Sequence, residues 1–258
     1  MQIDLQGQVA IVTGAAHGIG KAICTTLAGS GARIWAVDLL AEGLTETAAA
    51  VTARGGSCQT ATANLTDSQA VAAMVEKVQA AEGRVDMLVN CAGGVAGQAG
   101  QPVESITDEM WDVVVKTNLY SSFYCIRAVT PIMKAQGGGR IVNISSGAGR
   151  SVSLTGIQAY ASAKAGQLGL TRQMAHELGQ HQITVNAIAP GFVRSNPSTE
   201  RQWEAMGEER QRLLVEGTAL RRLGAAEDIA NGVLFFVSSL SGWVTGQTIS
   251  IDGGRHMI

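Results

Sequence analysis

VAIVTGAAHGIG, residues 9–20, is the stretch that most strongly indicates the fold of this 258-residue chain. An apolar run, Val9–Thr13, leads into the glycines Gly14, Gly18 and Gly20, and helical character follows. Glycines in a turn between a strand and a helix let the backbone approach a pyrophosphate, which binds the unpaired N–H groups of the helix N-terminus. A glycine-rich turn alone can be only a tight connection. Its place between a strand and a helix favours a nucleotide site.

Short β-rich runs alternate with helical stretches along the whole chain. The predicted strands are Val9–Thr13, Arg33–Asp38, Cys58–Ala61, Asp86–Asn90, Arg140–Ser145, Thr184–Ala189 and Thr248–Ile251. Their cores are continuously apolar, which is typical of parallel strands covered on both faces. The predicted helices include Asp67–Glu82, Asp108–Gln136 and Tyr160–Gly179. This alternation predicts a single α/β domain spanning residues 1–258, a doubly wound, Rossmann-type parallel sheet of about seven strands with helices on both faces.

Composition excludes several functions. The formal net charge of −2 gives no electrostatic footprint for nucleic acid or for an acidic membrane surface. No apolar run reaches the roughly 20 residues that span a bilayer, and the first residues lack the pattern of a secretory signal. We therefore expect a cytoplasmic protein. Four scattered cysteines without metal-ligand spacing are expected to be reduced, and no metal site is predicted: Cys24, Cys58, Cys91 and Cys125.

Asp38 ends the second predicted strand. A carboxylate there can accept hydrogen bonds from the adenosine ribose hydroxyls and would repel a 2′-phosphate. No Arg or Lys lies in the turn after Gly14 or just after Asp38, and a neutral His17 would bind that phosphate poorly. The sequence therefore predicts NAD as the cofactor. The alternative role of Asp38, capping a helix, explains the residue but not the missing cations.

Tyr160 and Lys164 are four residues apart, which places both side chains on one face of a helix. A tyrosine pKa of about 10 is too high for a base near neutral pH. An ammonium about 4 Å away, at an effective dielectric of about 20, would lower that pKa by roughly three units. We therefore expect Tyr160 to act as a general acid/base.

The segment from Arg194 to Gly217 is rich in charged and polar residues and follows the predicted strand Thr184–Ala189. Ligands of open α/β sheets bind outside the carboxyl ends of the strands. The segment at about 194–217 is therefore predicted to be a substrate lid. An ordinary pair of surface helices is the alternative.

Together these motifs resemble the short-chain dehydrogenase/reductase family over nearly the whole chain. The matching positions are the Thr13–Gly20 turn, Asn90-Cys91-Ala92-Gly93, Asn118, Asn143-Ile144-Ser145-Ser146, Tyr160-x-x-x-Lys164, Pro190-Gly191 and Ile251-Asp252-Gly253-Gly254. The resemblance implies an NAD-dependent oxidoreductase that transfers a hydride between the cofactor and a secondary alcohol or its ketone.

The resemblance also implies roles for four residues. Tyr160 would exchange a proton with the substrate, and Lys164 would lower the pKa of Tyr160 and bind the nicotinamide ribose. Ser146 would hold the substrate oxygen, and Asn118 would anchor a water in a proton relay. The family usually places its serine 13 residues before the tyrosine, whereas Ser146 lies 14 before it. Ser145 is the competing candidate, although alternation along a strand would turn its side chain to the opposite face.

The cofactor site that the resemblance implies follows the carboxyl ends of the strands. Its residues would be Gly14, His17, Gly18, Ile19, Gly20, Asp38, Asn64, Leu65, Asn90, Ala92, Gly93, Tyr160, Lys164, Pro190, Gly191, Val193 and Ser195. Asn64 departs from an acidic residue that is common in the family, and Cys91 departs from a common Asn.

The substrate is less clear from the sequence. Ser146 and Tyr160 would contact it, and Arg150 and Arg194 could bind a carboxylate, so we expect a sugar acid, a hydroxy acid or a polyol. Solvated surface cations are the alternative for both arginines. A 3-oxoacyl thioester reductase would need a basic surface and usually NADPH. A non-catalytic dinucleotide sensor would predict a damaged set of catalytic residues.

The resemblance implies a homotetramer as well. The predicted helices Asp108–Gln136 and Tyr160–Gly179 would pair between subunits, and small residues along the second helix permit close packing. The tail Arg255–Ile258 could reach the active site of a neighbouring subunit.

Overall fold

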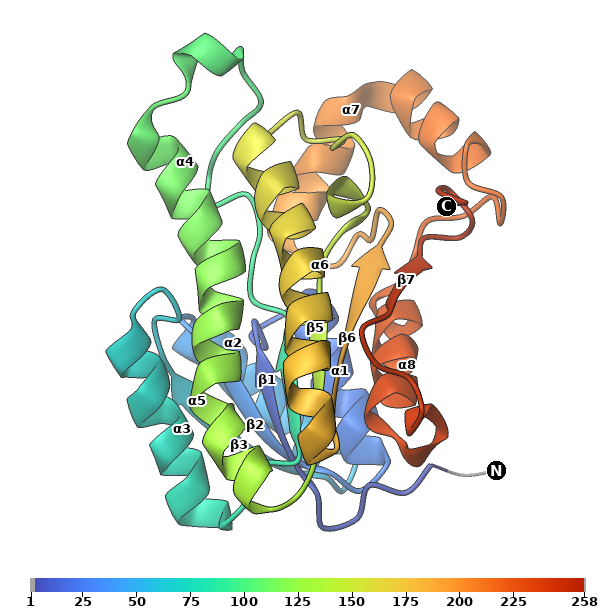
Figure 1. Ribbon diagram of the computed structural model, residues 1–258. Coiled ribbons are helices and arrows are strands. Elements are labelled where there is room, and N and C mark those ends of the chain that lie inside the picture. Colours follow the sequence, from blue (N-terminus) through green and yellow to red (C-terminus); the bar gives the residue numbers. More distant parts are fainter. Residues whose placement is uncertain (1–2, 258) are drawn as a thin grey trace.

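Seven parallel strands form the sheet of the computed structural model, which describes residues 3–257 (Figure 1). In chain order they are β1 (Val9–Thr13), β2 (Arg33–Asp38), β3 (Ser57–Thr62), β4 (Met87–Asn90), β5 (Gly139–Ile144), β6 (Ile183–Pro190) and β7 (Thr248–Ile251). Their spatial order is β3-β2-β1-β4-β5-β6-β7. The order reverses between β1 and β4, where a doubly wound sheet binds its ligand. The predicted fold class is confirmed, and each predicted strand is present within one residue at either end.

Helices cover both faces of the sheet. One face packs against α1 (Gly18–Gly29), α2 (Ala41–Thr52) and α8 (Ala226–Val237). The other packs against α3 (Ser68–Glu82), α5 (Ser121–Ala135) and α6 (Gln158–Leu178). Short 3-10 helices complete the chain: η1 (Val103–Ser105), η3 (Gly147–Gly149), η4 (Gly179–His181) and η5 (Ser239–Ser241).

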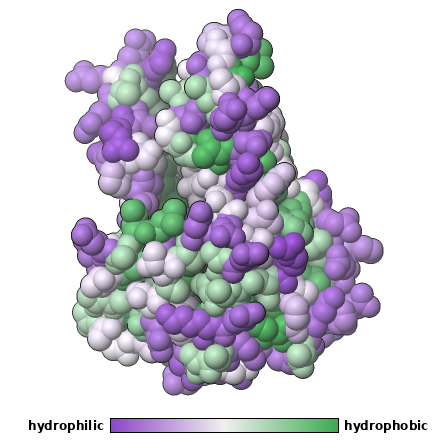
Figure 2. Space-filling model, turned by 90° about the vertical axis from the view of Figure 1, so that its left-hand side faces the viewer, coloured by the Kyte–Doolittle hydropathy of each residue, from purple (hydrophilic) through white to green (hydrophobic). Residues whose placement is uncertain are grey.

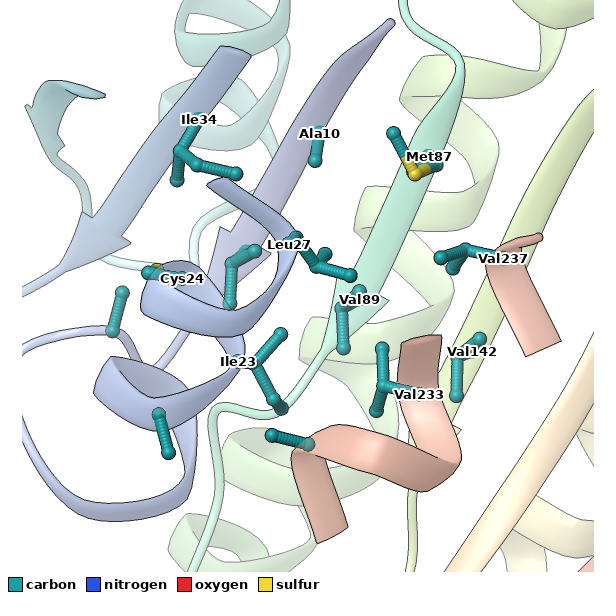
Figure 3. Packing of buried hydrophobic residues seen from close by; sticks show 14 of the residues in the cluster. Ala10, Ile23, Cys24, Leu27, Ile34, Met87, Val89, Val142, Val233 and Val237 are labelled. Carbon is teal, nitrogen blue, oxygen red and sulfur yellow. The ribbon is translucent and has the colours of Figure 1, made fainter. Parts of the chain in front are cut away.

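Alternation along each strand sends its side chains to the two cores in turn. In β1, Ala10 and Val12 belong to the core under α1 and α8, whereas Val9 and Ile11 belong to the opposite core. Figure 3 shows Ile23 of α1 and Val233 of α8 over the same face of the sheet as Val89. Both faces of the central strands are therefore apolar, which is why a strand such as β1 is hydrophobic along its length. The predicted continuity does not hold at the edge strand β3, Ser-Cys-Gln-Thr-Ala-Thr, whose side chains are mostly exposed or half-buried.

The predicted helix Asp108–Gln136 is three segments in the structure: α4 (Asp108–Val115), a π-helical stretch η2 (Lys116–Tyr120) and α5. A π-helix bonds each N–H to the carbonyl five residues earlier, and such bulges often occur at functional sites. This one contains Asn118, and its effect is described with the site.

The predicted lid segment contains α7 (Pro197–Glu216), a helix broken at Gly207, where φ is 72°. Asn196 caps this helix: its side chain accepts from the N–H groups of Ser198 and Thr199. Proline at the first helical position adds to the start signal. In Figure 1 the helix lies at the upper end of the molecule, where the strands end. Its action as a lid stays a prediction.

Within residues 3–257, no helix has the length and apolarity that crossing a membrane requires. The same residues hold no group of three or more His, Cys, Asp or Glu side chains arranged for a metal ion. All four cysteines carry free thiols.

Candidate active site

The residues predicted to act lie at the carboxyl ends of β1, β4, β5 and β6, in η2 and in the first two turns of α6. A notch separates two lobes at this upper end of the molecule (Figure 2). Parallel strands bring their carboxyl ends to one edge, so side chains far apart in the sequence meet there.

Ser146 follows β5 and begins η3, where its hydroxyl accepts from the Ala148 N–H at 3.2 Å. The same hydroxyl is hydrogen-bonded to the Tyr160 side chain. The close approach of η3 to α6 depends on Gly149, because a Cβ there would lie 2.7 Å from the Lys164 carbonyl oxygen. This packing brings the serine and the tyrosine together across 14 residues of sequence.

Ser145 has a different environment. Its hydroxyl is buried and donates to the Lys164 carbonyl at 2.9 Å. It therefore joins the end of β5 to the middle of α6. Of the two candidates, the structure places Ser146 beside Tyr160.

Lys164 is almost fully buried, with 3% of its surface exposed. Its Nζ donates to the Ile144 carbonyl at 2.9 Å and lies 5.8 Å from the centre of the Tyr160 ring. Because burial disfavours the charged ammonium, the pKa of Lys164 falls to about 8.

The expected lowering of the Tyr160 pKa is wrong for the structure as it stands. Burial raises that pKa above its ordinary value, and the hydrogen bond with Ser146 lowers it by less. The ammonium of Lys164 is directed to the Ile144 carbonyl and is itself partly neutral near pH 8. A protonated tyrosine is suited to donate a proton, and it becomes a base only as the pH rises.

Asn118 is fully buried in η2, and its side chain holds the loop that follows β4. Its Nδ2 donates to the Gly94 carbonyl at 2.7 Å, and its Oδ1 accepts from the Gly94 N–H at 2.9 Å. At Gly93, a Cβ would lie 2.6 Å from the Asn118 Oδ1 and 3.1 Å from the Lys164 Nζ. Only glycine therefore lets this loop pass between the two side chains.

The Asn118 carbonyl accepts hydrogen bonds from the Ser122 hydroxyl at 3.0 Å and from the Gln167 Nε2 at 3.1 Å. The Gln167 Nε2 also donates to the Ser122 hydroxyl at 2.7 Å. A π-helical turn shifts the backbone hydrogen-bond pattern of the helix. At this turn the Asn118 carbonyl is bound by the side chains of Ser122 and Gln167. The role of Asn118 in a water relay stays a prediction. Sequence reasoning missed Gln167. It is a polar residue about one turn after Lys164 on the same helix, and that spacing could have indicated it.

The turn after β1 fits a pyrophosphate. Helix α1 begins at Gly18, and its N-cap residue, His17, makes no side-chain cap, so its first N–H groups are available. A Cβ at Gly14 would lie 2.8 Å from the Ala92 backbone, and one at Gly18 would lie 2.7 Å from the Ser195 carbonyl. The buried Ser195 hydroxyl has no hydrogen-bond partner within residues 3–257. The bare backbone and the unpaired hydroxyl fit a dinucleotide.

Asp38 also joins this turn to the end of β2. Its Oδ2 accepts from the Ala16 N–H at 3.1 Å, and its Oδ1 accepts from Leu39 and Leu40 at 2.7 and 3.1 Å. The carboxylate therefore shapes the turn and places a negative charge beside it. Leu40, rather than Asp38, is the N-cap residue of α2.

The remaining predicted cofactor residues follow the same edge of the sheet. Asn90 is buried and donates to the Asn143 side chain at 2.9 Å, while the Thr13 hydroxyl accepts from the Cys91 and Ala92 N–H groups. Sequence reasoning gave Thr13 no such role. The other predicted positions lie at the start of α1, after β3, and at or just after the end of β6: Ile19, Gly20, Asn64, Leu65, Pro190, Gly191 and Val193.

Both candidate arginines have protein partners. Arg194 forms an ion pair with Glu200 at 2.7 Å and lies over the Trp203 ring at 5.2 Å from its centre. Arg150 donates to the Ser250 hydroxyl at 3.0 Å. Binding of a substrate carboxylate by either one stays a prediction.

The chain is similar to known proteins over nearly its whole length. The family model described as Enoyl-(Acyl carrier protein) reductase matches residues 14–256. The chain is 40% identical over 253 residues to the short-chain reductase protein NovJ of Streptomyces niveus, covering 97% of this chain and 94% of that protein. It is 33% identical over 256 residues to the 3-oxoacyl-[acyl-carrier-protein] reductase FabG of Escherichia coli K12, covering 99% and 100%. The crystal structure of levodione reductase has a TM-score of 0.91 at 34% identity, covering 97% of this chain and 98% of that one.

Proposed function

Because this chain belongs to the short-chain dehydrogenase/reductase family, we propose that it is an NAD-dependent dehydrogenase that interconverts a secondary alcohol and its ketone. The observation that supports this most strongly is the meeting of Ser146, Tyr160 and Lys164 beside a turn that fits a dinucleotide. The test is formation of NADH by the purified protein with a panel of secondary alcohols. Absence of turnover across the panel, in protein that binds NADH, would contradict the proposal.

The proposed mechanism divides the work among three side chains. When bound, the nicotinamide dinucleotide supplies the hydride acceptor or donor. Ser146 donates a hydrogen bond to the substrate oxygen, and Tyr160 gives that oxygen its proton in reduction or removes it in oxidation. Lys164, beside Gly93, binds ribose hydroxyls with its ammonium. The buried setting of these groups strengthens each interaction.

The choice of NAD over NADP rests on Asp38. Asp38→Asn removes the negative charge that would repel a 2′-phosphate. Its single amide oxygen can keep the hydrogen bonds from Leu39 and Leu40, while the one from the Ala16 N–H is lost. We expect the ratio of kcat/KM with NAD to kcat/KM with NADP to fall by about one to two orders of magnitude. Glu42→Gln, which removes an exposed charge at the start of α2, is the matched control and should leave the ratio unchanged. An unchanged ratio in Asp38→Asn would refute the assignment.

Reduction of a 3-oxoacyl thioester is a second candidate, favoured by the 33% identity with FabG. It would use the same Ser146, Tyr160 and Lys164. NADPH oxidation with acetoacetyl-CoA that exceeds NADH formation with every alcohol would favour this reading.

The proposed tetramer is supported by apolar side chains on α4, η2 and α5. Trp111, Val113, Tyr120 and Phe123 are 39%, 39%, 44% and 39% exposed. Figure 2 looks onto this side of the molecule, where apolar side chains lie among polar ones. Packing of the same helices from another subunit would cover these side chains.

Phe123→Glu tests the assembly. A charge at this position would be buried in the proposed helix–helix interface, so we expect light scattering to give a smaller mass than four chains. Leu213→Glu, at an exposed position of α7, is the control and should keep the wild-type mass. The proposal fails if wild-type protein is monomeric or if Phe123→Glu leaves the mass unchanged.

A further inference from the structure

His256 is held in one orientation by Asp252, directly after β7. The Asp252 carboxylate, of which 3% is exposed, accepts from the N–H groups of Gly254, Arg255 and His256 at 3.0, 3.2 and 3.0 Å. It also binds the His256 Nδ1 at 3.1 Å. These four hydrogen bonds to the buried Asp252 carboxylate fix the turn from Asp252 to His256 and the orientation of the His256 ring.

The ring lies against the loop that carries the catalytic serine. A Cβ at Gly147, the residue after Ser146, would lie 3.3 Å from the His256 Cε1 and 3.5 Å from the Pro190 carbonyl oxygen. The ring is therefore beside the carboxyl ends of β5 and β6, and the missing side chain of Gly147 leaves room for it. This contact is within one chain, and the reach of the tail Arg255–Ile258 into a neighbouring subunit stays a prediction; Ile258 lies outside the described residues.

One ring nitrogen remains available. Nδ1 faces the carboxylate, so in the neutral ring it carries the proton and Nε2 carries the lone pair. Nε2 has no hydrogen-bond partner among residues 3–257, and 25% of the side chain is exposed. It is thus an available hydrogen-bond acceptor on a fixed ring that lies against the residue after Ser146.

We propose that His256 Nε2 accepts a hydrogen bond from a second hydroxyl of the substrate, so that the preferred substrates are diols or hydroxy ketones with the two oxygens on adjacent carbons. This inference rests on the proposed function and narrows its substrate class. The arginines that would favour an acid instead are engaged with Glu200 and with Ser250. A site built to bind a hydroxyl discriminates against the analogue that lacks it.

The test compares three alcohols on one carbon skeleton, with NAD as cofactor: cyclohexanol, trans-1,2-cyclohexanediol and trans-2-hydroxycyclohexanecarboxylate. We expect wild-type kcat/KM to be highest for the diol. His256→Leu should lower kcat/KM for the diol about tenfold and change that for cyclohexanol less than about twofold. His256→Gln, which keeps an acceptor, should restore most of the loss. His176→Leu, at an exposed position of α6, is the matched control and should change neither.

Binding without turnover provides a second readout. In Tyr160→Phe protein saturated with NADH, His256→Leu should raise the calorimetric Kd of the diol about tenfold. Equal losses for diol and cyclohexanol, or a preference for the hydroxy acid, would overturn the inference and leave the proposed function standing. Absence of turnover with all three alcohols would overturn both.

Discussion

Tyr160→Phe is expected to lower kcat/KM for alcohol oxidation by about two to four orders of magnitude, which is the usual contribution of a general acid/base. Phenylalanine keeps the aromatic ring at this position of α6 but removes the hydroxyl that Ser146 binds. NADH binding, measured by fluorescence, should stay within about twofold, because the loss concerns proton transfer. Tyr124→Phe removes a hydroxyl from the half-buried ring that packs on Tyr120. It is the matched control and should keep full activity.

The dependence of kcat/KM on pH tests the same role of Tyr160. Burial raises the Tyr160 pKa, so the deprotonated form that oxidation requires becomes more populated only toward alkaline pH. We expect wild-type kcat/KM for oxidation to rise from about pH 7 to about pH 10, and Tyr160→Phe to lose that rise. A flat wild-type profile, or a variant with normal activity, would show that another group transfers the proton.

Lys164→Met is expected to reduce activity at least about a hundredfold and to stabilise the cofactor-free protein. In the folded protein the Lys164 pKa is about 8, against an ordinary value of 10.5. Below pH 8 the lysine is protonated in both the folded and the unfolded state. Protonating it in the buried site costs about 3 kcal/mol more than in the unfolded chain, which destabilises the wild-type fold by that amount. Methionine has no such cost, although the Ile144 carbonyl loses a hydrogen bond worth about 1 kcal/mol. The net gain at pH 7 is about 2 kcal/mol.

The pH dependence identifies the cause of that stabilisation. The stability gain of Lys164→Met over wild type should be largest below pH 8 and should fall as the pH rises. Well above pH 10.5 the lysine is neutral in both states, only the lost hydrogen bond to the Ile144 carbonyl remains, and the variant should be slightly less stable than wild type. Urea denaturation across this range measures it. Lys116→Met, which removes an exposed lysine paired with Asp112, should show no such trend. A pH-independent difference would assign the effect to packing.

The strands and the first turn could be predicted from the sequence because their signals are local. Val9–Val12 is apolar without interruption, and the glycines that follow Thr13 occur where the structure has tight backbone contacts. The break in the helix Asp108–Gln136 could not be predicted, because a π-turn inserts one residue without disturbing the apolar pattern on either side. Asn118 itself was identified, but its partners Gly94 and Gln167 come from other elements.

Electrostatics of the site depend on burial, which the sequence shows poorly. The spacing of Tyr160 and Lys164 placed them together, yet the sign of the tyrosine shift was wrong because both groups are desolvated. Arg194 looked available for a substrate carboxylate, and the structure pairs it with Glu200. Such pairings follow from the fold of the segment that carries them.

Transfer of deuterium from the alcohol carbon to the cofactor tests the central claim most directly. A secondary alcohol from the panel, deuterated at its carbinol carbon, would be incubated with the protein and NAD, and the reduced cofactor would be examined by mass spectrometry. The account predicts that the reduced cofactor carries one deuterium in wild type, and that Tyr160→Phe forms almost none. Reduced cofactor without deuterium, or equal labelling by the variant, would contradict it.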